Sequence, residues 1–144
     1  MTTKVKYMPG VCNIGPAEMK RRRQGGWFGS GATIILWAAL WIFRVPAPWR
    51  LSLFFPATMG ASGFIQAALH FCAGFGMRGV FNFGPEVGRT ETVEQTEFRR
   101  KDRRMALQIG LYSGLIGIAI AIAGFLLVFP YWVMYYYNKK YLFD

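Results

Sequence analysis

Four polar side chains recur at every fourth position of an otherwise apolar stretch, residues 51–84. They are Thr58, Ser62, Gln66 and His70. In a helix this spacing places them in one slowly drifting row. We consider two interpretations of the row. It forms hydrogen bonds to neighbouring helices, or it lines a polar path or holds a cofactor within a membrane.

Candidate metal ligands accompany the end of this row. His70 is the only histidine, and Cys12 and Cys72 are the only cysteines. Two thiols and an imidazole can bind a soft metal or form a redox site, and His70 alone could ligate a tetrapyrrole. Because the CxxC-type spacing of most metal sites is absent, the alternative is two unrelated buried thiols, and the sequence requires no cofactor.

Motifs of the common enzyme classes are absent from the sequence. It contains no GxGxxG, P-loop, nucleophile elbow or HExxH pattern. A Ser–His–acid triad is not expected from one histidine at a membrane edge. We therefore expect no enzymatic activity.

The composition is typical of an integral membrane protein. Of the 144 residues, 53% are hydrophobic and 17% aromatic, and the apolar residues come in long blocks. The net charge is +10, but lysine and arginine border the apolar blocks. This pattern favours contact with lipid headgroups and argues against nucleic-acid binding.

Three helices are predicted to cross the membrane, so the expected fold class is all-α. The first two spans cover residues 26–43 and 51–76. A third, long helix is expected over residues 92–129, because Thr92 and Gln95 fit a capping box and Glu97 with Lys101 is a favourable ion pair. Its length of about 55 Å exceeds the hydrocarbon core of about 30 Å, so its start should project into the cytoplasm.

These elements divide the chain into three parts. Residues 1–25 form a basic arm with a short surface helix that starts at Pro16. Residues 26–84 form a two-helix hairpin with an interfacial loop, and residues 85–144 form the third helix with an aromatic tail. We expect residues 70–82, at the end of the second span, to lie beside the arm at residues 12–23.

Charge distribution predicts the orientation. Lysine and arginine are dense in the arm and the second loop and sparse in the first loop and the tail. The positive-inside rule then places the N-terminus in the cytoplasm and the C-terminus outside, in a multi-pass protein of the bacterial inner membrane. The residues expected to contact lipid phosphates are Arg21, Arg22, Arg23, Arg99, Arg100, Arg103 and Arg104.

Small residues mark one face of the third helix. They are Gly110, Gly114, Gly117, Ala121 and Gly124. Their alternating spacing of four and three keeps a smooth seam along which another helix can pack closely. The partner helix could belong to this chain or to another.

Residues 12–84 contain a set of short motifs in a characteristic order. They are Asn-Ile-Gly at 13–15, Glu18, the basic run 20–23, Gly-Gly at 25–26, Phe-Cys at 71–72, Phe75 and Gly-Val-Phe-Asn at 79–82. This order resembles the YgaP-like transmembrane domain, a two-helix bacterial membrane domain. The resemblance implies the fold and topology of the hairpin, with Cys72 at a recurring position. The chain departs from the family in Ala73, where a proline is usual, and in its third helix.

The function expected from the sequence is that of a non-catalytic accessory subunit in a larger membrane complex of the respiratory or photosynthetic type. Its partners would be membrane lipids and other membrane subunits. One alternative is a redox, metal or cofactor protein that uses Cys12, His70 and Cys72. The other is a homo-oligomeric channel or transporter lined by Thr58, Ser62 and Gln66.

Overall fold

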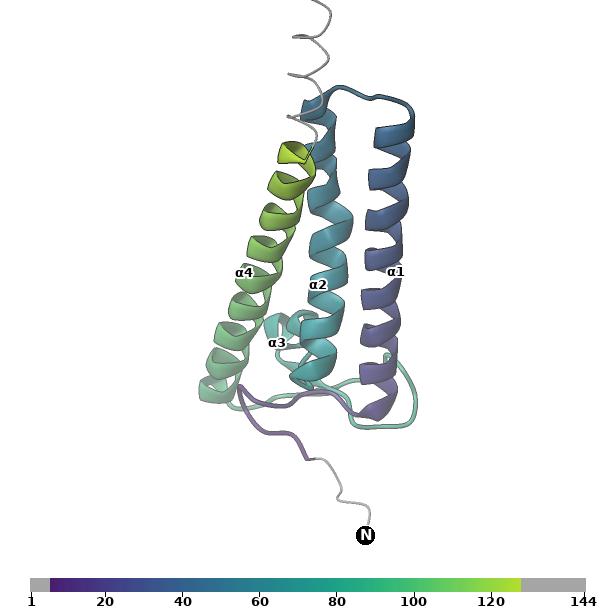
Figure 1. Cartoon of the computed structure of the whole chain (residues 1–144). Helices are drawn as coiled ribbons and strands as arrows, with labels where there is room; N and C mark the ends of the chain where they lie inside the picture. The colour runs from purple at the N-terminus through teal and green to yellow at the C-terminus, as the bar shows by residue number, and fades with distance from the viewer. Residues whose placement is uncertain (1–5, 128–144) are drawn as a thin grey trace, which may run out of the picture.

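Three long helical rods lie side by side in the computed structural model, which describes residues 6–127 (Figure 1). The rods are α1 (Pro16–Ile42), η1 with α2 (Ala47–Leu53 and Phe54–Ala68) and α4 (Thr96–Leu126). The second rod lies between the other two and runs antiparallel to both (Figure 1). Short α3 (Ala73–Arg78) packs against α4, and β1 (Val80–Phe81) pairs with β2 (Glu91–Thr92) in antiparallel register. The described chain is therefore mostly helical, as expected.

The first helix is longer than predicted. Pro16 occupies its first turn, as expected, but α1 then continues without a break to Ile42. The separate surface helix at 16–24 and the boundary between residues 25 and 26 are therefore wrong. Gly26 does not interrupt the helix because it is buried, and a Cβ there would lie 2.9 Å from the Phe64 ring of α2. Packing against α2 outweighs the low helix propensity of glycine.

The second helix is shorter than predicted. It ends at Ala68, and His70 adopts a left-handed backbone conformation with φ of 54°. The single span over residues 51–76 is therefore wrong, because the chain turns at His70 and restarts as α3. At the other end, η1 is a 3₁₀-helix, and Pro56 lies in the first turn of α2, where its missing N–H is tolerated.

Two pairs of glycines bring α1 and α2 together. A Cβ at Gly29 would lie 2.7 Å from the Cα of Gly60, and one at Gly63 would lie 2.7 Å from the Cα of Gly26. No side chain separates the two helices at these points. This is the close approach that small residues permit between membrane helices.

Packing between α2 and α4 uses part of the predicted seam. Gly117, Ala121 and Gly124 are buried on α4. A Cβ at Gly117 would lie 3.1 Å from the carbonyl oxygen of Phe54 and closer still to Thr58 Oγ1. A Cβ at Gly110 or Gly114 would meet nothing within 4 Å. These two glycines therefore lie outside the interface within the chain.

The start of α4 also differs from the prediction. Thr92 belongs to β2, where it pairs with Val80, so the capping box with Gln95 is not formed and the helix begins at Thr96. The predicted ion pair between Glu97 and Lys101 is confirmed at 3.4 Å. The aromatic tail after residue 127 lies outside the described residues.

Two of the rods, α1 and α4, are long and apolar enough to cross a membrane. Only 11% of the apolar window of α1 and 28% of that of α4 are buried within the chain. The core helix of a soluble protein would bury most of such a window. The α2 helix has 15 residues, so it does not reach spanning length without η1.

Candidate functional site

Buried and partly buried polar side chains gather at one end of the bundle, where the N-terminal arm and the loops around α3 meet. Five of them, which we call the polar cluster, are Asn13, Glu18, Arg22, Cys72 and Asn82. They come from the arm, from the first turns of α1, from the start of α3 and from the residue after β1. The cluster brings together segments that lie fifty or more residues apart in the sequence.

Asn13 joins the arm to the turn before α3. Its side-chain Oδ1 accepts from the backbone N–H of Cys72 at 2.6 Å, and its Nδ2 donates to the carbonyl oxygen of Cys72 at 3.1 Å. Its backbone N–H donates to the carbonyl of His70, and its own carbonyl accepts from Asn82. Asn13 is fully buried. Because buried backbone groups need hydrogen-bond partners, its bonds stabilise the turn that precedes α3.

Glu18 lies in the first turn of α1 but is buried rather than exposed to solvent. Its Oε1 accepts from Asn82 Nδ2 at 3.3 Å and from the backbone N–H of Gly88 at 2.7 Å. Its Oε2 lies 3.9 Å from Nη2 of Arg22. A carboxylate in the first turn also suits the helix dipole. Glu18 therefore holds the loop after β1 against α1.

Arg22 connects the carboxylate to the thiol. Its Nη2 donates to Cys72 Sγ at 2.9 Å, and its guanidinium lies over the ring of Phe75, 5.8 Å from the centroid. Cys72 Sγ also accepts from the backbone N–H of Phe75 at 3.4 Å and so caps α3. The thiol is thus in contact with a cation and with a backbone donor.

A second polar contact fixes the arm to α4. Asp102 is fully buried and accepts from the Tyr7 hydroxyl at 2.8 Å and from the backbone N–H of Gly10 at 2.6 Å. Tyr7 also stacks on Phe81. Burial, followed by the hydrogen bond and the charge of Asp102, raises the pKa of Tyr7 above its ordinary value of 10.0.

The structure does not assemble the predicted metal site. No group of three or more His, Cys, Asp or Glu side chains within residues 6–127 is arranged to hold a metal ion. Cys12 is buried, with its Sγ directed to the carbonyl of Ile14, and burial raises the pKa of its thiol. The His70 side chain is exposed, and the residue contributes its backbone carbonyl to the polar cluster. What the sequence predicted correctly is that residues 70–82 lie beside the arm.

The polar row of α2 is used within the chain. Gln66 Nε2 donates to Ser62 Oγ at 2.7 Å, and its Oε1 accepts from the backbone N–H of Ala73. Thr58 faces α4 at Gly117. His70 leaves the row because the helix ends before it. Of the hydrogen bonds to neighbouring helices that the first interpretation predicted, the described residues form one, from the N–H of Ala73 to Gln66, and Thr58 Oγ1 is buried without a partner among them.

The predicted lipid-binding arginines fall into two groups. Arg22 binds within the polar cluster, and Arg99 donates from Nε to the carbonyl of Val93 at 2.5 Å. These two therefore bind within the chain through a hydrogen bond, although Arg99 is otherwise exposed. The others are exposed and free of side-chain partners among the described residues, namely Arg21, Arg23, Arg100, Arg103 and Arg104.

Sequence reasoning missed the structural importance of several polar residues. Glu18 and Asp102 each stand as the lone acid beside a basic run, and that contrast is a usable signal for a buried carboxylate. Asn13 and Asn82 carry no comparable signal, because their partners are backbone groups of remote segments. The glycine pairs of α1 and α2 repeat at a spacing of three and could have been recognised.

The reactive group of the polar cluster is the buried thiol of Cys72 beside the guanidinium of Arg22, within a network that otherwise binds backbone groups. Most of its hydrogen bonds join segments of the fold. The comparisons add no family to this description: the chain matches no protein-family model, no curated protein and no solved structure.

Proposed function

We propose that the protein is a non-catalytic subunit that crosses a membrane three times and packs against other membrane chains. The observation that carries the proposal is the apolar surface of α1 and α4. Large hydrophobic side chains remain exposed along both helices, and η1 with α2 supplies a third rod of similar length (Figure 1). Such a surface is stable in lipid or against another apolar chain.

The distribution of lysine and arginine supports an orientation with the polar cluster on the cytoplasmic side. Of the described lysines and arginines, only Arg44 and Arg50 belong to the end of the bundle away from the polar cluster. Under the positive-inside rule the polar cluster then faces the cytoplasm. For a bacterial chain this corresponds to the inner membrane.

The open part of the α4 seam is the surface best suited to a partner helix. Gly110 and Gly114 are four residues apart, and a side chain added at either would meet nothing. Their spacing allows two backbones to approach closely in lipid, where van der Waals packing drives association. The adjacent buried face of the same helix already packs on α2 in this way.

A co-purification experiment tests this function. The protein and its Gly114→Ile variant are isolated in mild detergent, and co-eluting chains are identified by mass spectrometry. We expect the wild type to elute with other membrane subunits and the variant to lose them. Gly31→Ile is the matched control, because Gly31 of α1 is also open. A wild-type protein that elutes alone and monodisperse contradicts the proposal.

Contact between Arg22 and Cys72 favours a thiol-dependent redox protein as the second candidate. The guanidinium lies within hydrogen-bond distance of Sγ, and cations beside a cysteine promote thiol reactivity. Elemental and optical analysis of the purified chain, together with alkylation of Cys12→Ala and Cys72→Ala variants, tests it. A sample without metal or pigment and with an unreactive Cys72 removes this candidate.

The proposed hairpin also accommodates the YgaP-like resemblance. Asn13, Cys72 and Asn82 belong to the motifs that carry it, and Asn13 is hydrogen-bonded both to Cys72 and to Asn82. Their pairing gives the motifs a shared structural role. It supports the resemblance as a hypothesis about residues 12–84.

A further inference from the structure

Three exposed arginines form a cation cluster near the start of α4. They are Arg100, Arg103 and Arg104. The acids on this part of the helix are engaged elsewhere, because Glu97 pairs with Lys101 at 3.4 Å and Asp102 is buried against the arm. No described carboxylate lies within ion-pair distance of the three arginines. The cluster therefore lacks a counter-charge within the described chain.

The same side of α4 continues as an uncovered apolar surface. Spacings of three and four keep residues on one face of a helix, and they connect Arg100, Arg103, Leu107, Gly110 and Gly114, with Arg104 and Leu111 beside them. We call this set the open face of α4. Leu107 is 60% exposed and Leu111 61%, and a Cβ at either glycine would meet nothing within 4 Å. One turn further, Gly117 packs on α2, so the open face adjoins an established interface.

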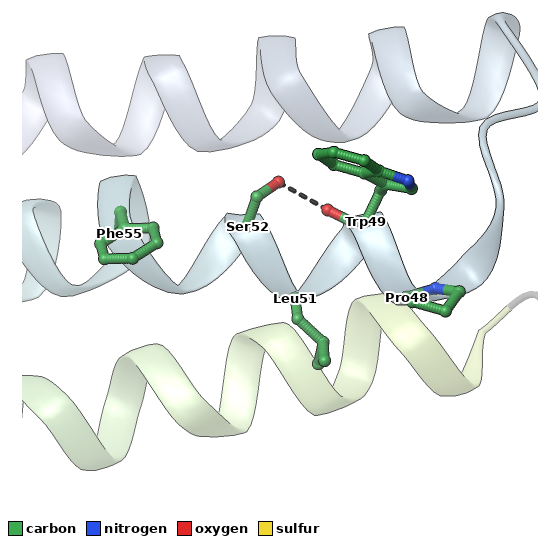
Figure 2. Close-up of a pocket in the computed structure, with 5 residues that line it drawn as sticks. All are labelled: Pro48, Trp49, Leu51, Ser52 and Phe55. Carbon is green, nitrogen blue, oxygen red and sulfur yellow. Dashed lines mark hydrogen bonds between the residues drawn. The ribbon is translucent and has the colours of Figure 1, made fainter.

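An apolar groove on the outer face of η1 offers no comparable specificity (Figure 2). Its volume is about 350 Å³, and it is lined by Pro48, Trp49, Leu51, Ser52 and Phe55, none of which is charged. The hydroxyl of Ser52 already donates to the carbonyl of Trp49 at 2.6 Å. Such a groove accepts lipid or any apolar chain, whereas the charges on the open face of α4 restrict what can bind there.

Charge disfavours a second copy of the chain as the occupant of the open face. Two copies inserted under the positive-inside rule have the same orientation, so their α4 helices would pack in parallel. Symmetric contact through Gly110 and Gly114 would then place the arginines of one copy beside the same arginines of the other. Their separation would fall within the Debye length of about 8 Å, and like charges at such an interface oppose association.

We propose that the open face of α4 binds a membrane helix of a different chain, which carries acidic side chains just cytoplasmic of its span. The inference rests on the proposed function and names the chemistry of the partner. Carboxylates of that helix neutralise the arginines, because guanidinium binds a carboxylate through two parallel hydrogen bonds. Arg104 and Arg100 lie about 12–18 Å along α4 from the midpoint between Gly110 and Gly114. The partner therefore carries its carboxylates about 8–12 residues from its own contact with these glycines.

Co-purification of the full chain and two matched triple variants in dodecyl maltoside tests the partner chemistry, with co-eluting chains quantified by mass spectrometry. The α4 variant carries Arg100→Gln, Arg103→Gln and Arg104→Gln. The α1 variant carries Lys20→Gln, Arg21→Gln and Arg23→Gln, and so loses the same charge from exposed residues at the same end of the bundle. We expect the α1 variant to retain the partner. The α4 variant should recover about tenfold less, as for the loss of three exposed ion pairs.

Two further measurements keep all the arginines in place. Raising the salt concentration from about 0.1 M to about 1 M shortens the Debye length from about 10 Å to about 3 Å, so wild-type recovery of the partner should fall toward that of the α4 variant. A photoreactive residue at position 111 should cross-link the same partner, and the sequence of that partner should show the predicted acids. Position 112 is the control, because Tyr112 is also exposed but lies about 100° further around the helix.

Several results would overturn this inference, and they are distinct from failure of the proposed function. Equal recovery of the partner by both triple variants, together with its loss from Gly114→Ile, would refute the acidic partner and leave the proposed function standing. A cross-link from position 111 to a second copy would assign the open face to self-association. Phosphatidylglycerol lost from the α4 variant, with the partner retained, would assign the arginines to lipid headgroups. A wild type that elutes alone would refute both proposals.

Discussion

Substitution of Gly29 by alanine tests the close crossing of α1 and α2. A Cβ at this position would lie 2.7 Å from the Cα of Gly60 and 2.9 Å from the carbonyl oxygen of Pro56, and nearer still to the backbone nitrogen of Gly60. All three obstacles are backbone atoms of α2. No rotation of a side chain can relieve the overlap, so the helices themselves must move apart.

The size of the effect follows from these distances. Ordinary contacts between heavy atoms are about 3.5–4.0 Å, so the two helices must separate by about 1 Å where they cross. Overpacking of a core typically costs about 1–3 kcal/mol. Because the clash is with backbone and the shift also loosens the Gly26–Gly63 contact, we expect Gly29→Ala to lower the free energy of unfolding by about 3 kcal/mol.

Unfolding by sodium dodecyl sulfate from dodecyl maltoside, followed by circular dichroism, measures this loss. Gly31→Ala is the matched control on the same helix, where a Cβ would meet nothing within 4 Å. Alanine is favoured over glycine in a helix by about 0.5–1 kcal/mol, so the control should be unchanged or slightly stabilised. A difference below about 0.5 kcal/mol between the two variants would refute the close crossing.

Other substitutions probe the polar contacts by the same unfolding assay. Asn13→Ala leaves the buried backbone N–H of Cys72 unpaired, whereas the Cys72 carbonyl keeps its bond from the N–H of Gly76. The substitution should cost about 1–3 kcal/mol, and a loss below about 0.5 kcal/mol would contradict its role. Thr58→Val replaces a buried hydroxyl that has no described partner and should be neutral or stabilising by about 1 kcal/mol, whereas a clear loss would reveal a partner for the hydroxyl. The raised pKa of Tyr7 keeps its phenol neutral in the folded protein, so stability should fall as the pH rises above 10.0, where the unfolded chain ionises. In Tyr7→Phe this fall should be smaller, and an identical pH profile would argue against the contact with Asp102.

Much of the architecture could be predicted from local features of the sequence. Pro16 marks the start of α1 because its missing N–H is harmless there. The apolar stretch between Lys101 and the end of α4 contains no helix breaker, so its helicity was clear. The contact between the arm and residues 70–82 could be predicted from the charge distribution, because the positive-inside rule places both segments on the same side of the membrane.

The errors lie where remote segments decide the local structure. No helix-breaking residue around His70 explains why α2 ends at Ala68. Instead, the Asn13 side chain is hydrogen-bonded to the backbone N–H and carbonyl of Cys72, and two N–H groups of the arm donate to the carbonyl of His70. These bonds favour a turn over another helical turn. Thr92 carries a good capping signal, yet it pairs with Val80 across the sheet. In both cases tertiary hydrogen bonds outweigh local preference.

The glycines show how far a periodic pattern can be interpreted. Spacing alone predicted one packing face from Gly110 to Gly124 on α4, and within the described chain Gly117, Ala121 and Gly124 of this set are buried. The buried face, however, runs through Ile109 and Ser113 before it reaches Gly117, so the seam turns around the helix and leaves Gly110 and Gly114 uncovered. Because Gly114 lies beside this buried face and a Cβ there would meet nothing within 4 Å, a side chain added at Gly114 should disturb association without unfolding the bundle. A side chain added at Gly117 should unfold the bundle by meeting Thr58. The contrast between these two positions separates assembly from folding on a single helix.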